Sequence, residues 1–344
     1  MVYKNFLFNF SSSYSGGGLK RLVAFSEWFN NKGGACFIVN SKVEKIMSQY
    51  SNNNYFYVDV SRIEKFINNQ NYIHDSIIEM RRCDFYYSYN IPIKHNFADI
   101  NWFHLSNVLP FHNVLSYNIP FGRGVELWWL GRLIKMGLKN ANIISAESQF
   151  SLNLMGDKGN KKACISPNGS DNEIDFISNP LDINPVKNIA IVIGTYHHKN
   201  ILDSYKIYRY LRVKNKELKL VIIGDIGTIP LFIKNDPQVD LKGVIGHDAV
   251  FALLYRARFY INSSKIENSW NAASEGIFFA EESFISKIPP HCELLQGSIM
   301  KVLDCLDTVF HPIIHVYRDN LTKKKLKTWD EVITNMNEYI KNRK

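Results

Sequence analysis

Short hydrophobic runs alternate with helical periodicity from one end of the chain to the other. The run at 4–10 (KNFLFNF) predicts a strand, residues 19–31 have the spacing of an amphipathic helix, and 35–40 (ACFIVN) predicts a second strand. Further strands of the first half are expected at 54–60, 84–90, 101–106 and 142–147. Strands separated by helices predict a parallel sheet with right-handed crossovers.

The second half repeats this pattern. Strands are expected at 187–194, 219–225 and 258–264, with helices at 199–213 and 247–257 between them. Two such runs predict an α/β protein with two Rossmann-like doubly wound parallel-sheet domains facing a central cleft. Because ligands of such sheets bind at the carboxyl ends of the strands, the cleft is the expected active site.

A polar stretch with two prolines and no clear periodicity, 170–188, marks the expected boundary between the domains. We therefore expect an N-terminal domain at 1–170, a linker at 171–187 and a C-terminal domain at 188–320. Residues 321–344 are expected to contribute a C-terminal helix that returns to the first domain.

Composition narrows the class of protein. Hydrophobic residues make up 46% of the chain and charged residues 21%, which is typical of a globular protein. Five scattered cysteines without a Cys-x-x-Cys pair indicate neither a disulfide framework nor a zinc site. The N-terminus does not resemble a signal peptide, and no apolar run approaches the roughly 20 residues that a membrane span needs. These features predict a cytoplasmic protein.

The formal net charge of +9 is unevenly distributed. Residues 1–170 hold 18 Lys and Arg against 11 Asp and Glu, a net of +7, whereas 171–344 hold 23 against 21, a net of +2. A basic half suggests an anionic partner such as a phosphorylated substrate or a membrane surface, although a charge excess that only keeps the protein soluble fits equally well. No zinc-finger or RNA-binding signature occurs, so no nucleic-acid partner is expected.

One predicted helix mixes basic and aromatic side chains. Arg132 and Lys135 occur close to Trp128 and Trp129 in the segment 123–144. This combination suits an anionic membrane surface and favours peripheral association with the inner face of the plasma membrane. A core helix with a solvated basic face is the alternative.

The most informative stretch is 263–276 (SSKIENSWNAASEG). It follows an expected strand and precedes an apolar helical run, and Glu267 and Glu275 stand eight residues apart in it. Backbone N–H groups at a helix start suit an anion or sugar hydroxyls, and each carboxylate can accept hydrogen bonds from a diol. A polar loop whose carboxylates cap a helix fits the same spacing.

This stretch resembles the Glu-x7-Glu motif of the large retaining glycosyltransferase family with two Rossmann-like domains, which has the GT-B fold (glycosyltransferase group 1, or family 4-like). Its opening at 266–269 is of the Ile-Glu-Asn-Ser type found in many members. The resemblance implies a catalytic role for Glu267 beside the donor sugar, and contacts between Glu275 and the ribose hydroxyls of the nucleotide. It also implies donor contacts from Asn268 and Ser269.

A glycine-rich turn precedes the first expected helix. Gly16, Gly17 and Gly18 lie between that helix and the first strand, where backbone without side chains can approach a phosphate or a sugar closely. The resemblance places this loop against the donor. A flexible surface loop is the alternative.

The turn at 194–200 (GTYHHKN) is similar to the diphosphate-binding turn of the family. Lys199 matches the usual Lys and is implied to act in catalysis by stabilising the leaving diphosphate, with Thr195 and Asn200 as further donor contacts. The Arg that usually accompanies this Lys is not evident.

Two later segments resemble the family pattern as well. Gly224 ends the run VIIGD and is implied to lie beside the donor. Val244 and Ile245 belong to the segment LKGVIGHDAVFALL, whose backbone groups are implied to contact the nucleotide base. An ordinary turn between strand and helix fits each segment equally well.

His104 lies near the end of the strand expected at 101–106, facing the cleft. A histidine there can bind the transferred sugar or move a proton, and we assign it a catalytic role. A structural histidine is the alternative.

Several motifs are absent from the sequence. Without an Asp-x-Asp pair, which the single-domain glycosyltransferase class uses to hold a metal ion on the diphosphate, neither a metal nor another cofactor is expected. Neither a G-x-x-x-x-G-K-[ST] loop nor a G-x-G-x-x-G fingerprint occurs, so ATP hydrolysis and nicotinamide chemistry are disfavoured.

The resemblance implies transfer of a sugar from a nucleoside-diphosphate sugar to a lipid-linked oligosaccharide acceptor, with retention of anomeric configuration. Synthesis of bacterial surface polysaccharide, of the O-antigen (lipopolysaccharide) or capsule type, is the expected context. Two alternatives stay open. A non-catalytic sugar-nucleotide-binding subunit is suggested by the missing Arg, and a sugar-nucleotide epimerase fits a similar cleft.

Overall fold

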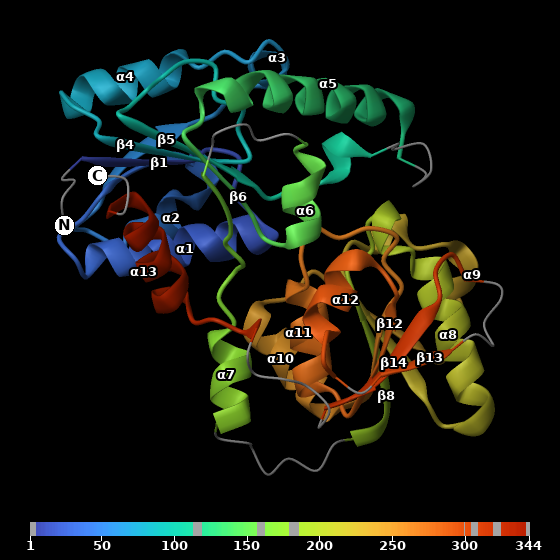
Figure 1. Cartoon of the computed structure of the whole chain (residues 1–344). Coiled ribbons are helices and arrows are strands. Elements are labelled where there is room, and N and C mark those ends of the chain that lie inside the picture. The colour runs from blue at the N-terminus through green and yellow to red at the C-terminus, as the bar shows by residue number, and fades with distance from the viewer. Residues whose placement is uncertain are drawn as a thin grey trace. The chain divides into compact units, whose positions relative to one another are not determined.

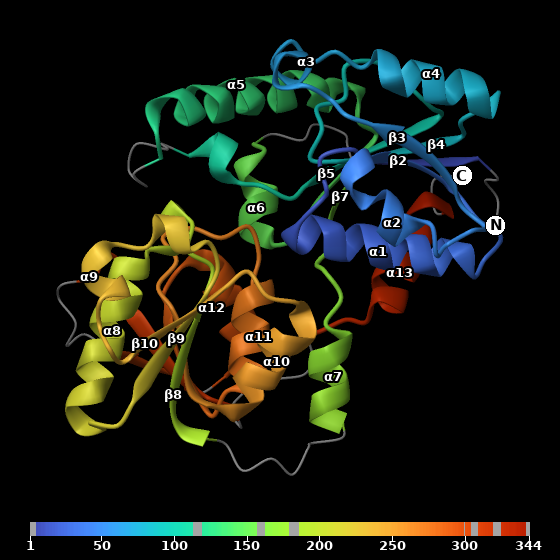
Figure 2. The same cartoon turned by 180° about the vertical axis from the view of Figure 1, so that it is seen from behind.

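The computed structural model describes residues 5–112, 119–156, 162–178, 186–298, 300–303, 309–318 and 325–341. The chain divides into two compact units. Unit 1 comprises Met1–Val114, Pro120–Gly169 and Lys327–Lys344, and unit 2 comprises Leu115–Ile119 and Ser170–Leu326. Each unit has one sheet with helices on both of its faces (Figures 1 and 2).

The sheet of unit 1 is parallel, and its described strands follow the order β3-β2-β1-β4-β5-β6-β7. The strands are β1 (Phe6–Phe10), β2 (Cys36–Asn40), β3 (Asn54–Val58), β4 (Phe85–Tyr89), β5 (Ile100–Leu105), β6 (Ile143–Ala146) and β7 (Lys162–Ile165). Because the order proceeds in opposite directions from β1 and from β4, the topological switch point of this sheet lies between these two strands.

The helices of unit 1 cover both faces of its sheet. They are α1 (Gly16–Asn30), α2 (Glu44–Met47), α3 (Arg62–Phe66), α4 (Asn71–Met80), α5 (Phe121–Gly137), α6 (Gln149–Leu154) and α13 (Trp329–Lys341). Both views place α1 and α13 on one face and α3, α4 and α5 on the other (Figures 1 and 2). The C-terminal helix α13 therefore belongs to unit 1.

The core of unit 1 is built largely from aromatic rings. Successive side chains of a strand point to opposite faces, so Phe6, Phe8 and Phe10 of β1 all enter the core beneath α1. Helical spacing places Ile333 and Met336 of α13 in the same core. The sheet and two helices distant in sequence thus share one hydrophobic core.

The sheet of unit 2 is mixed, with the described strands in the order β10-β9-β8-β11-β12-β14-β13. The strands are β8 (Val186–Ile193), β9 (Lys219–Ile223), β10 (Val239–Gly243), β11 (Ala257–Asn262), β12 (Glu282–Ser286), β13 (Lys301–Leu303) and β14 (Ile313–Tyr317). The first five are parallel, whereas β14 pairs antiparallel with both β12 and β13. The switch point lies between β8 and β11.

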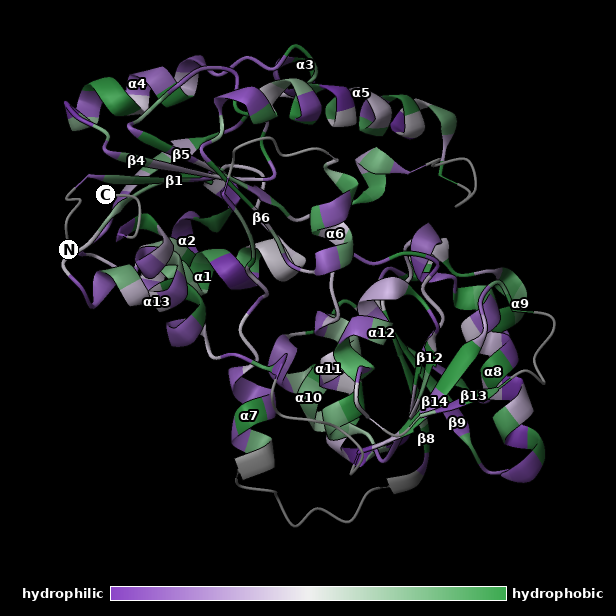
Figure 3. Ribbon diagram, in the orientation of Figure 1, coloured by the Kyte–Doolittle hydropathy of each residue, from purple (hydrophilic) through white to green (hydrophobic). Residues whose placement is uncertain are grey.

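Both faces of the second sheet are buried, which explains why its strands read as continuous apolar runs. On β8, Ile191 enters the core under α10 and α11, while Ala190 and Val192 enter the core under α8. The helices are α7 (Asp171–Ser178), α8 (Ile201–Lys214), α9 (Leu231–Lys234), α10 (His247–Arg256), α11 (Asn271–Phe279) and α12 (Pro289–Leu295). In Figure 3 the strands are mostly hydrophobic, whereas the helices mix hydrophobic and hydrophilic residues.

The prediction of two doubly wound α/β domains is confirmed. The segment 171–187, which we expected to be a linker, begins instead with the helix α7. Its residue Glu173 is buried and accepts a hydrogen bond from the Ser274 hydroxyl at 3.0 Å. The polar sequence of this segment does not indicate a packed helix. The hydrogen bond that the Glu173 carboxylate accepts comes from Ser274, about a hundred residues away in the sequence.

Candidate functional site

The switch point of the second sheet gathers the loops that follow β8 and β11. The Lys265 backbone N–H donates to the His198 carbonyl at 2.7 Å, and the Ser263 hydroxyl donates to the Asn200 carbonyl at 2.7 Å. These two bonds hold 194–200 against 263–267. As a result Lys199 and Glu267, which are distant in sequence, become neighbours at the place where doubly wound sheets bind ligands.

Lys199 and Glu267 form an ion pair. The Lys199 Nζ donates to Glu267 Oε1 at 2.5 Å, and the two side chains are 16% and 15% exposed. The Ser264 hydroxyl lies 2.6 Å from the same carboxylate oxygen. Burial alone would raise the pKa of Glu267, but the Lys199 ammonium beside it and these hydrogen bonds hold that pKa below its usual range. Glu267 is therefore an anion at neutral pH.

Two histidines lie near this pair, His198, which is partly buried, and His291, which is fully buried. Burial lowers the pKa of His198 to about 4, although the Glu267 charge opposes the shift. His291, at the start of α12, is fully buried, and its Nδ1 donates to the Ser286 carbonyl at 2.8 Å. Burial lowers its pKa to about 4 as well. Both rings are neutral at pH 7, so His198 does not supply the positive charge of the absent Arg.

Neither histidine was assigned a role from the sequence. His291 follows the end of β12, and the rule that ligands bind at the carboxyl ends of parallel strands would have selected the segment 286–291. His198 stands next to Lys199 in the turn that the sequence did select. The sequence gives no sign that the His291 ring is buried or that the His198 ring is partly buried.

The turns at 194 and 224 need glycine. Gly194 has φ of +88° and Gly224 has φ of +144°, which other residues rarely adopt. A Cβ on Gly224 would lie 2.9 Å from the Thr195 hydroxyl oxygen. That hydroxyl donates to the Asp225 carbonyl at 2.9 Å, so the side chain of Thr195 fastens the two turns together. The donor contacts of Thr195 and Gly224 stay predictions.

Asn200 holds a left-handed conformation with φ of +55°, which asparagine tolerates better than most residues. Its side-chain amide donates to Asp203 at 2.6 Å in the first turn of α8. Asn268 and Ser269 follow Glu267 in the same loop; Ser269 is buried and Asn268 is partly buried. Their contacts with a donor stay predictions too.

Glu275 lies in α11, which packs unusually closely against β11. A Cβ on Gly276 would overlap the Tyr260 ring at 2.1 Å, so glycine permits this approach. The Oε1 of Glu275 lies 3.3 Å from Nε2 of His247, the first residue of α10. The sequence gave His247 no role, although it begins a helix just after the carboxyl end of β10.

Val244 and Ile245 follow β10 directly. Val244 is 84% exposed, whereas Ile245 packs against the core of unit 2. An exposed apolar residue beside backbone groups is compatible with contact to a planar base. Its contact with a nucleotide stays a prediction.

Gly16, Gly17 and Gly18 belong to unit 1, where they begin α1 after β1. Gly16 has φ of +59°, and a Cβ on Gly18 would lie 3.1 Å from the Ser13 hydroxyl. The turn therefore requires small residues for its own geometry. These glycines are not part of the cluster in unit 2, and their contact with a donor stays a prediction.

His104 was expected to face a ligand cleft; instead its side chain is fully buried within unit 1. The ring stacks on Tyr89 at 5.3 Å and on Tyr87 at 5.9 Å, and its Nδ1 lies 2.8 Å from the Ser145 hydroxyl. Burial, assisted by the positive charge of Arg21, lowers the pKa of His104 to about 3. In this position the ring is a neutral part of the core. Because the side chain has no exposed surface, its burial does not support the predicted role in sugar transfer.

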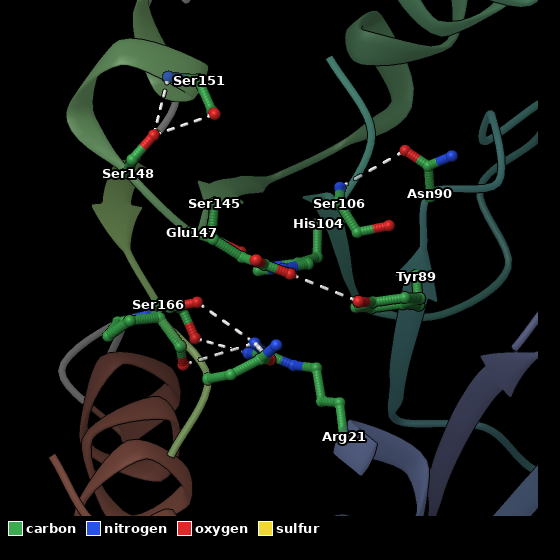
Figure 4. A network of polar contacts seen from close by, with 12 residues as sticks. Arg21, Tyr89, Asn90, His104, Ser106, Ser145, Glu147, Ser148, Ser151 and Ser166 are labelled. Atoms are coloured by element: carbon green, nitrogen blue, oxygen red, sulfur yellow. Dashed lines mark hydrogen bonds and ion pairs between the residues drawn. The ribbon is translucent and has the colours of Figure 1, made fainter. Parts of the chain in front are cut away.

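Figure 4 shows the polar network around His104. Glu147 is buried and accepts a hydrogen bond from the Tyr89 hydroxyl at 3.3 Å. Arg21 is also buried, and donates to the Ser166 hydroxyl at 2.6 Å and to the Asn168 side chain at 3.2 Å. Arg21 thereby fastens the last residues of unit 1 before the chain passes to unit 2.

The described residues contain neither a candidate metal site nor a helix that could span a membrane. No group of three or more His, Cys, Asp or Glu side chains there is arranged to hold a metal ion. Likewise, none of the helices in those residues is both long enough and apolar enough to cross a membrane. The expectation that the chain works without a metal stays a prediction.

Known proteins resemble this chain in structure but not in sequence. Neither a family model nor a curated protein matches the sequence. Anabaena HepE, solved in complex with UDP and glucose, superposes with a TM-score of 0.58 at 12% identity, covering 86% of this chain and 84% of its own. An α,α-trehalose-phosphate synthase (UDP-forming) from Burkholderia xenovorans gives 0.55 at 9% identity, covering 86% and 88%.

A glycosyltransferase from Rickettsia africae also matches, with a TM-score of 0.55 at 13% identity over 86% of this chain and 82% of its own. These proteins are glycosyltransferases of the GT-B fold. Likeness at such low identity shows the fold, and the predicted GT-B fold is confirmed.

Proposed function

We propose that this chain is a glycosyltransferase that takes its sugar from a nucleoside-diphosphate sugar bound at the carboxyl edge of the second sheet. The observation that carries the proposal is the Lys199–Glu267 ion pair at the switch point between β8 and β11. Structural neighbours with the same fold were solved with UDP and glucose, or are named for forming UDP, which supports a uridine nucleotide as the first candidate.

The ion pair suits this chemistry for a physical reason. An ammonium group carries three N–H donors, so Lys199 can hold Glu267 and a diphosphate oxygen at the same time. Negative charge builds on the diphosphate as the glycosidic bond breaks, and Lys199 stabilises it. Glu267, kept ionised by that lysine, accepts hydrogen bonds from sugar hydroxyls and stabilises positive charge developing on the sugar ring.

The remaining donor contacts follow from position. Glu275, held by His247, receives the ribose hydroxyls, and the exposed backbone at Val244 and Ile245 lies beside the base. Asn268 and Ser269 adjoin the sugar. We propose retention of anomeric configuration and a reaction without a metal, in which the Lys199 ammonium takes the place of the metal at the diphosphate.

We further propose a lipid-linked oligosaccharide acceptor and a place in bacterial surface polysaccharide synthesis of the O-antigen, lipopolysaccharide or capsule type. A cytoplasmic enzyme bound peripherally to the inner membrane would meet both substrates. The basic residues of α5 support this placement, since Arg132, Lys135 and Lys139 are exposed on it or directly after it. Vesicles with 30% phosphatidylglycerol should sediment the wild-type protein more than neutral vesicles do, and salt should weaken the difference.

Reversing these three side chains to Glu should abolish that preference. The matched control reverses Lys214, Lys216 and Lys219 of unit 2, which are also exposed. Equal sedimentation of the α5 variant and the wild type on anionic vesicles would reject α5 as the membrane contact.

One assay separates the proposed activity from its alternatives. The protein is incubated with UDP-, GDP- and dTDP-sugars, with and without a bacterial membrane lipid extract, and with EDTA in a parallel series. A transferase releases the nucleoside diphosphate and labels a lipid only when the extract is present. An epimerase converts the donor without any extract, and a binding subunit does neither. Activity that disappears in EDTA and returns with Mn²⁺ would reject the metal-free mechanism.

The binding-subunit alternative has one observation in its favour. Lys199 lacks the usual Arg partner, and the partly buried His198 beside it is neutral at pH 7. The diphosphate site therefore holds one positive charge fewer than the resemblance implies. Nucleotide binding without transfer or hydrolysis in the assay above would establish this alternative.

A further inference from the structure

Ser264, a fully buried residue beside Glu267, has two acceptors for one proton. It follows the end of β11 by two residues. Its hydroxyl oxygen lies 2.6 Å from Oε1 of Glu267 and 2.6 Å from Oδ1 of Asn262. A serine hydroxyl carries a single proton, which turns about the Cβ–Oγ bond. The proton can therefore be donated to only one of these two neighbours at a time.

Both neighbours can only accept this proton. The Ser264 backbone N–H donates to the same Asn262 atom at 3.0 Å, so that atom is the amide oxygen and not the amide nitrogen. Glu267 is ionised beside the Lys199 ammonium, and an ionised carboxylate has no proton to donate. A carboxylate accepts a stronger hydrogen bond than a neutral amide does. In the free protein the Ser264 proton is therefore donated to Glu267.

The two oxygens of the Glu267 carboxylate have different surroundings. Oε1 accepts from both the Lys199 ammonium, at 2.5 Å, and the Ser264 hydroxyl. Oε2 has no hydrogen-bond partner among the residues that the structure describes, and the side chain is 15% exposed. A carboxylate held by two donors on one oxygen cannot turn freely about its Cγ–Cδ bond. Oε2 is therefore the oxygen that remains for a ligand.

The position of Ser264 decides which acceptor receives its proton, because both lie at the same distance. Its carbonyl is held from the neighbouring strand, since the hydroxyl of Ser286, the last residue of β12, donates to it at 2.7 Å. The Ser286 carbonyl accepts in turn from Nδ1 of His291 at 2.8 Å. Ser286 and His291 are both fully buried. Breaking buried hydrogen bonds is costly, so Ser264 stays within reach of Glu267.

We propose that Ser264 is a positioning residue, which fixes Oε1 of Glu267 and thereby presents Oε2 to a hydroxyl group of the transferred sugar. Ser286 and His291 act one step further away by keeping Ser264 in place. None of these three side chains touches the ligand, since none has exposed surface. The inference rests on the proposed function and deepens it, because it names the carboxylate oxygen that receives the sugar and the residues that orient it.

The contribution of the sugar to binding tests this role. The probes are UDP-glucose, UDP-galactose, UDP-N-acetylglucosamine, GDP-mannose and dTDP-glucose, each compared by calorimetry with its own nucleoside diphosphate. For the probe that binds the wild type most tightly, Ser264→Ala should weaken the sugar nucleotide about threefold or more, the value of roughly one hydrogen bond. The affinity for the diphosphate alone should change by less than about twofold. A residue that only supports the fold would weaken both ligands alike.

A double-mutant cycle shows whether Ser264 acts through Glu267. Turnover should fall about tenfold or more in Ser264→Ala, because Oε2 is no longer held in the productive direction. In the Glu267→Gln background the same substitution should lower turnover by less than about twofold, since no carboxylate is left to orient.

The separation of each residue from Glu267 predicts the order of the effects. Ser286→Ala should lower turnover less than Ser264→Ala does, and His291→Phe should lower it less again, because each acts through the one before. Ser283→Ala is the matched control. Ser283 is also a buried serine of β12, and its hydroxyl has no hydrogen-bond partner in the described part of the chain. This variant should leave turnover and sugar-nucleotide affinity unchanged.

The contact between Ser264 and Glu267 can also be tested without any ligand. Ser264→Ala should lower the melting temperature by a few degrees. In the Glu267→Gln background the fall should be about half as large, because a hydrogen bond to a charged group is roughly twice as strong as one to a neutral group.

Several results would overturn the proposal. They are an equal loss of turnover in both backgrounds, equal weakening of the sugar nucleotide and its diphosphate in Ser264→Ala, or an equal fall in melting temperature in both backgrounds, which would assign the proton to Asn262. An absence of binding by every sugar nucleotide would reject the proposed function and this inference together. Binding that behaves as expected in a protein that transfers no sugar would refute the proposed function alone.

Discussion

The first five strands of the two sheets follow the same order, but the units differ in what they place at the switch point. In unit 2 the loops after β8 and β11 carry an ion pair whose two members are each about one-sixth exposed. In unit 1 the corresponding loops line a pocket of hydroxyl, amide and aromatic groups, while the titratable cluster of His104 and Glu147 is buried among the strands. The same topology thus presents an ion pair in one unit, and hydroxyl, amide and aromatic groups beside the charged side chains of α3 and α5 in the other.

This difference indicates which ligand each unit is built to take. A partly exposed charged group at the strand ends can form hydrogen bonds with a ligand in addition to its partner in the protein. A fully buried group can bond only to its neighbours in the fold. A diphosphate therefore suits unit 2, and a ligand rich in hydroxyl groups suits unit 1. The following predictions test that division, from the largest expected effect to the smallest.

Replacing Glu267 by Gln should have the largest effect, because it removes the negative charge next to the reacting sugar while keeping the shape. We expect turnover to fall about 10²-fold or more, with little change in affinity for the bare nucleotide. Glu275→Gln should do the reverse, weakening nucleotide binding more than turnover at saturation. Steady-state kinetics and calorimetry separate the two effects.

The control is Glu217→Gln, an exposed carboxylate just before β9, at the opposite edge of the sheet. If Glu267→Gln retains near-normal turnover, the catalytic assignment of Glu267 is wrong, and the binding-subunit alternative gains support.

Lys199→Ala should weaken nucleoside diphosphate binding by about 1.5–3 kcal/mol, the value of a hydrogen bond to a charged group, or roughly 10- to 150-fold in affinity. Lys199→Ala also leaves the Glu267 carboxylate without its cation, which should lower stability. The double variant Lys199→Ala with Glu267→Gln should therefore recover stability but not affinity. Lys214→Ala, at the other end of α8, should change neither. Unchanged nucleoside diphosphate affinity in Lys199→Ala, measured by calorimetry, would show that Lys199 does not bind the diphosphate.

Three histidines whose pKa is lowered by burial, two of them fully buried and one partly buried, predict a dependence of stability on pH. The folded pKa of His104 is about 3, and those of His198 and His291 are about 4, all below the value of about 6.5 in an unfolded chain. The unfolded state therefore takes up protons first as the pH falls. The stabilisation is complete above about pH 6.5 and is lost toward pH 4, at up to about 1.4 kcal/mol per pH unit for each histidine.

His104→Phe keeps an aromatic ring in the stack but cannot take up a proton. Denaturant unfolding followed between pH 7 and pH 4.5 should give this variant a smaller slope than the wild type by one histidine's share. His95→Phe, an exposed position in unit 1, should leave the slope close to that of the wild type. Identical slopes for wild type and His104→Phe would contradict the burial of a neutral His104.

The fold could be predicted from the sequence because the central strands of both sheets are buried on both faces. Apolar runs such as FLFNF and LVII mark such strands without reference to anything distant, and the helices between them show their own period. The antiparallel strand β14 was not predicted, because its direction depends on the path of the connection that leads to it, which the sequence pattern does not encode.

The candidate site could be predicted only in part. Strand ends located the segments around Lys199 and Glu267, but their pairing joins residues 68 positions apart, which no local pattern reports. His104 shows the opposite failure. It lies one residue before the end of β5, and whether its ring is exposed depends on Tyr87, Tyr89 and Ser145 of neighbouring strands. Position in the sequence places a residue on a strand, while its neighbours decide its exposure.

Hydrogen–deuterium exchange with bound nucleotide tests the central claim most directly. The nucleotide is whichever of UDP, GDP, dTDP and ADP raises the melting temperature most, since a ligand of the folded state stabilises it by mass action. We predict that the strongest slowing of exchange occurs in unit 2, at 194–200 and 263–276. Strongest slowing in unit 1 around the pocket residues 62–72, with 194–200 and 263–276 unchanged, would contradict the assignment of the nucleotide to the second sheet.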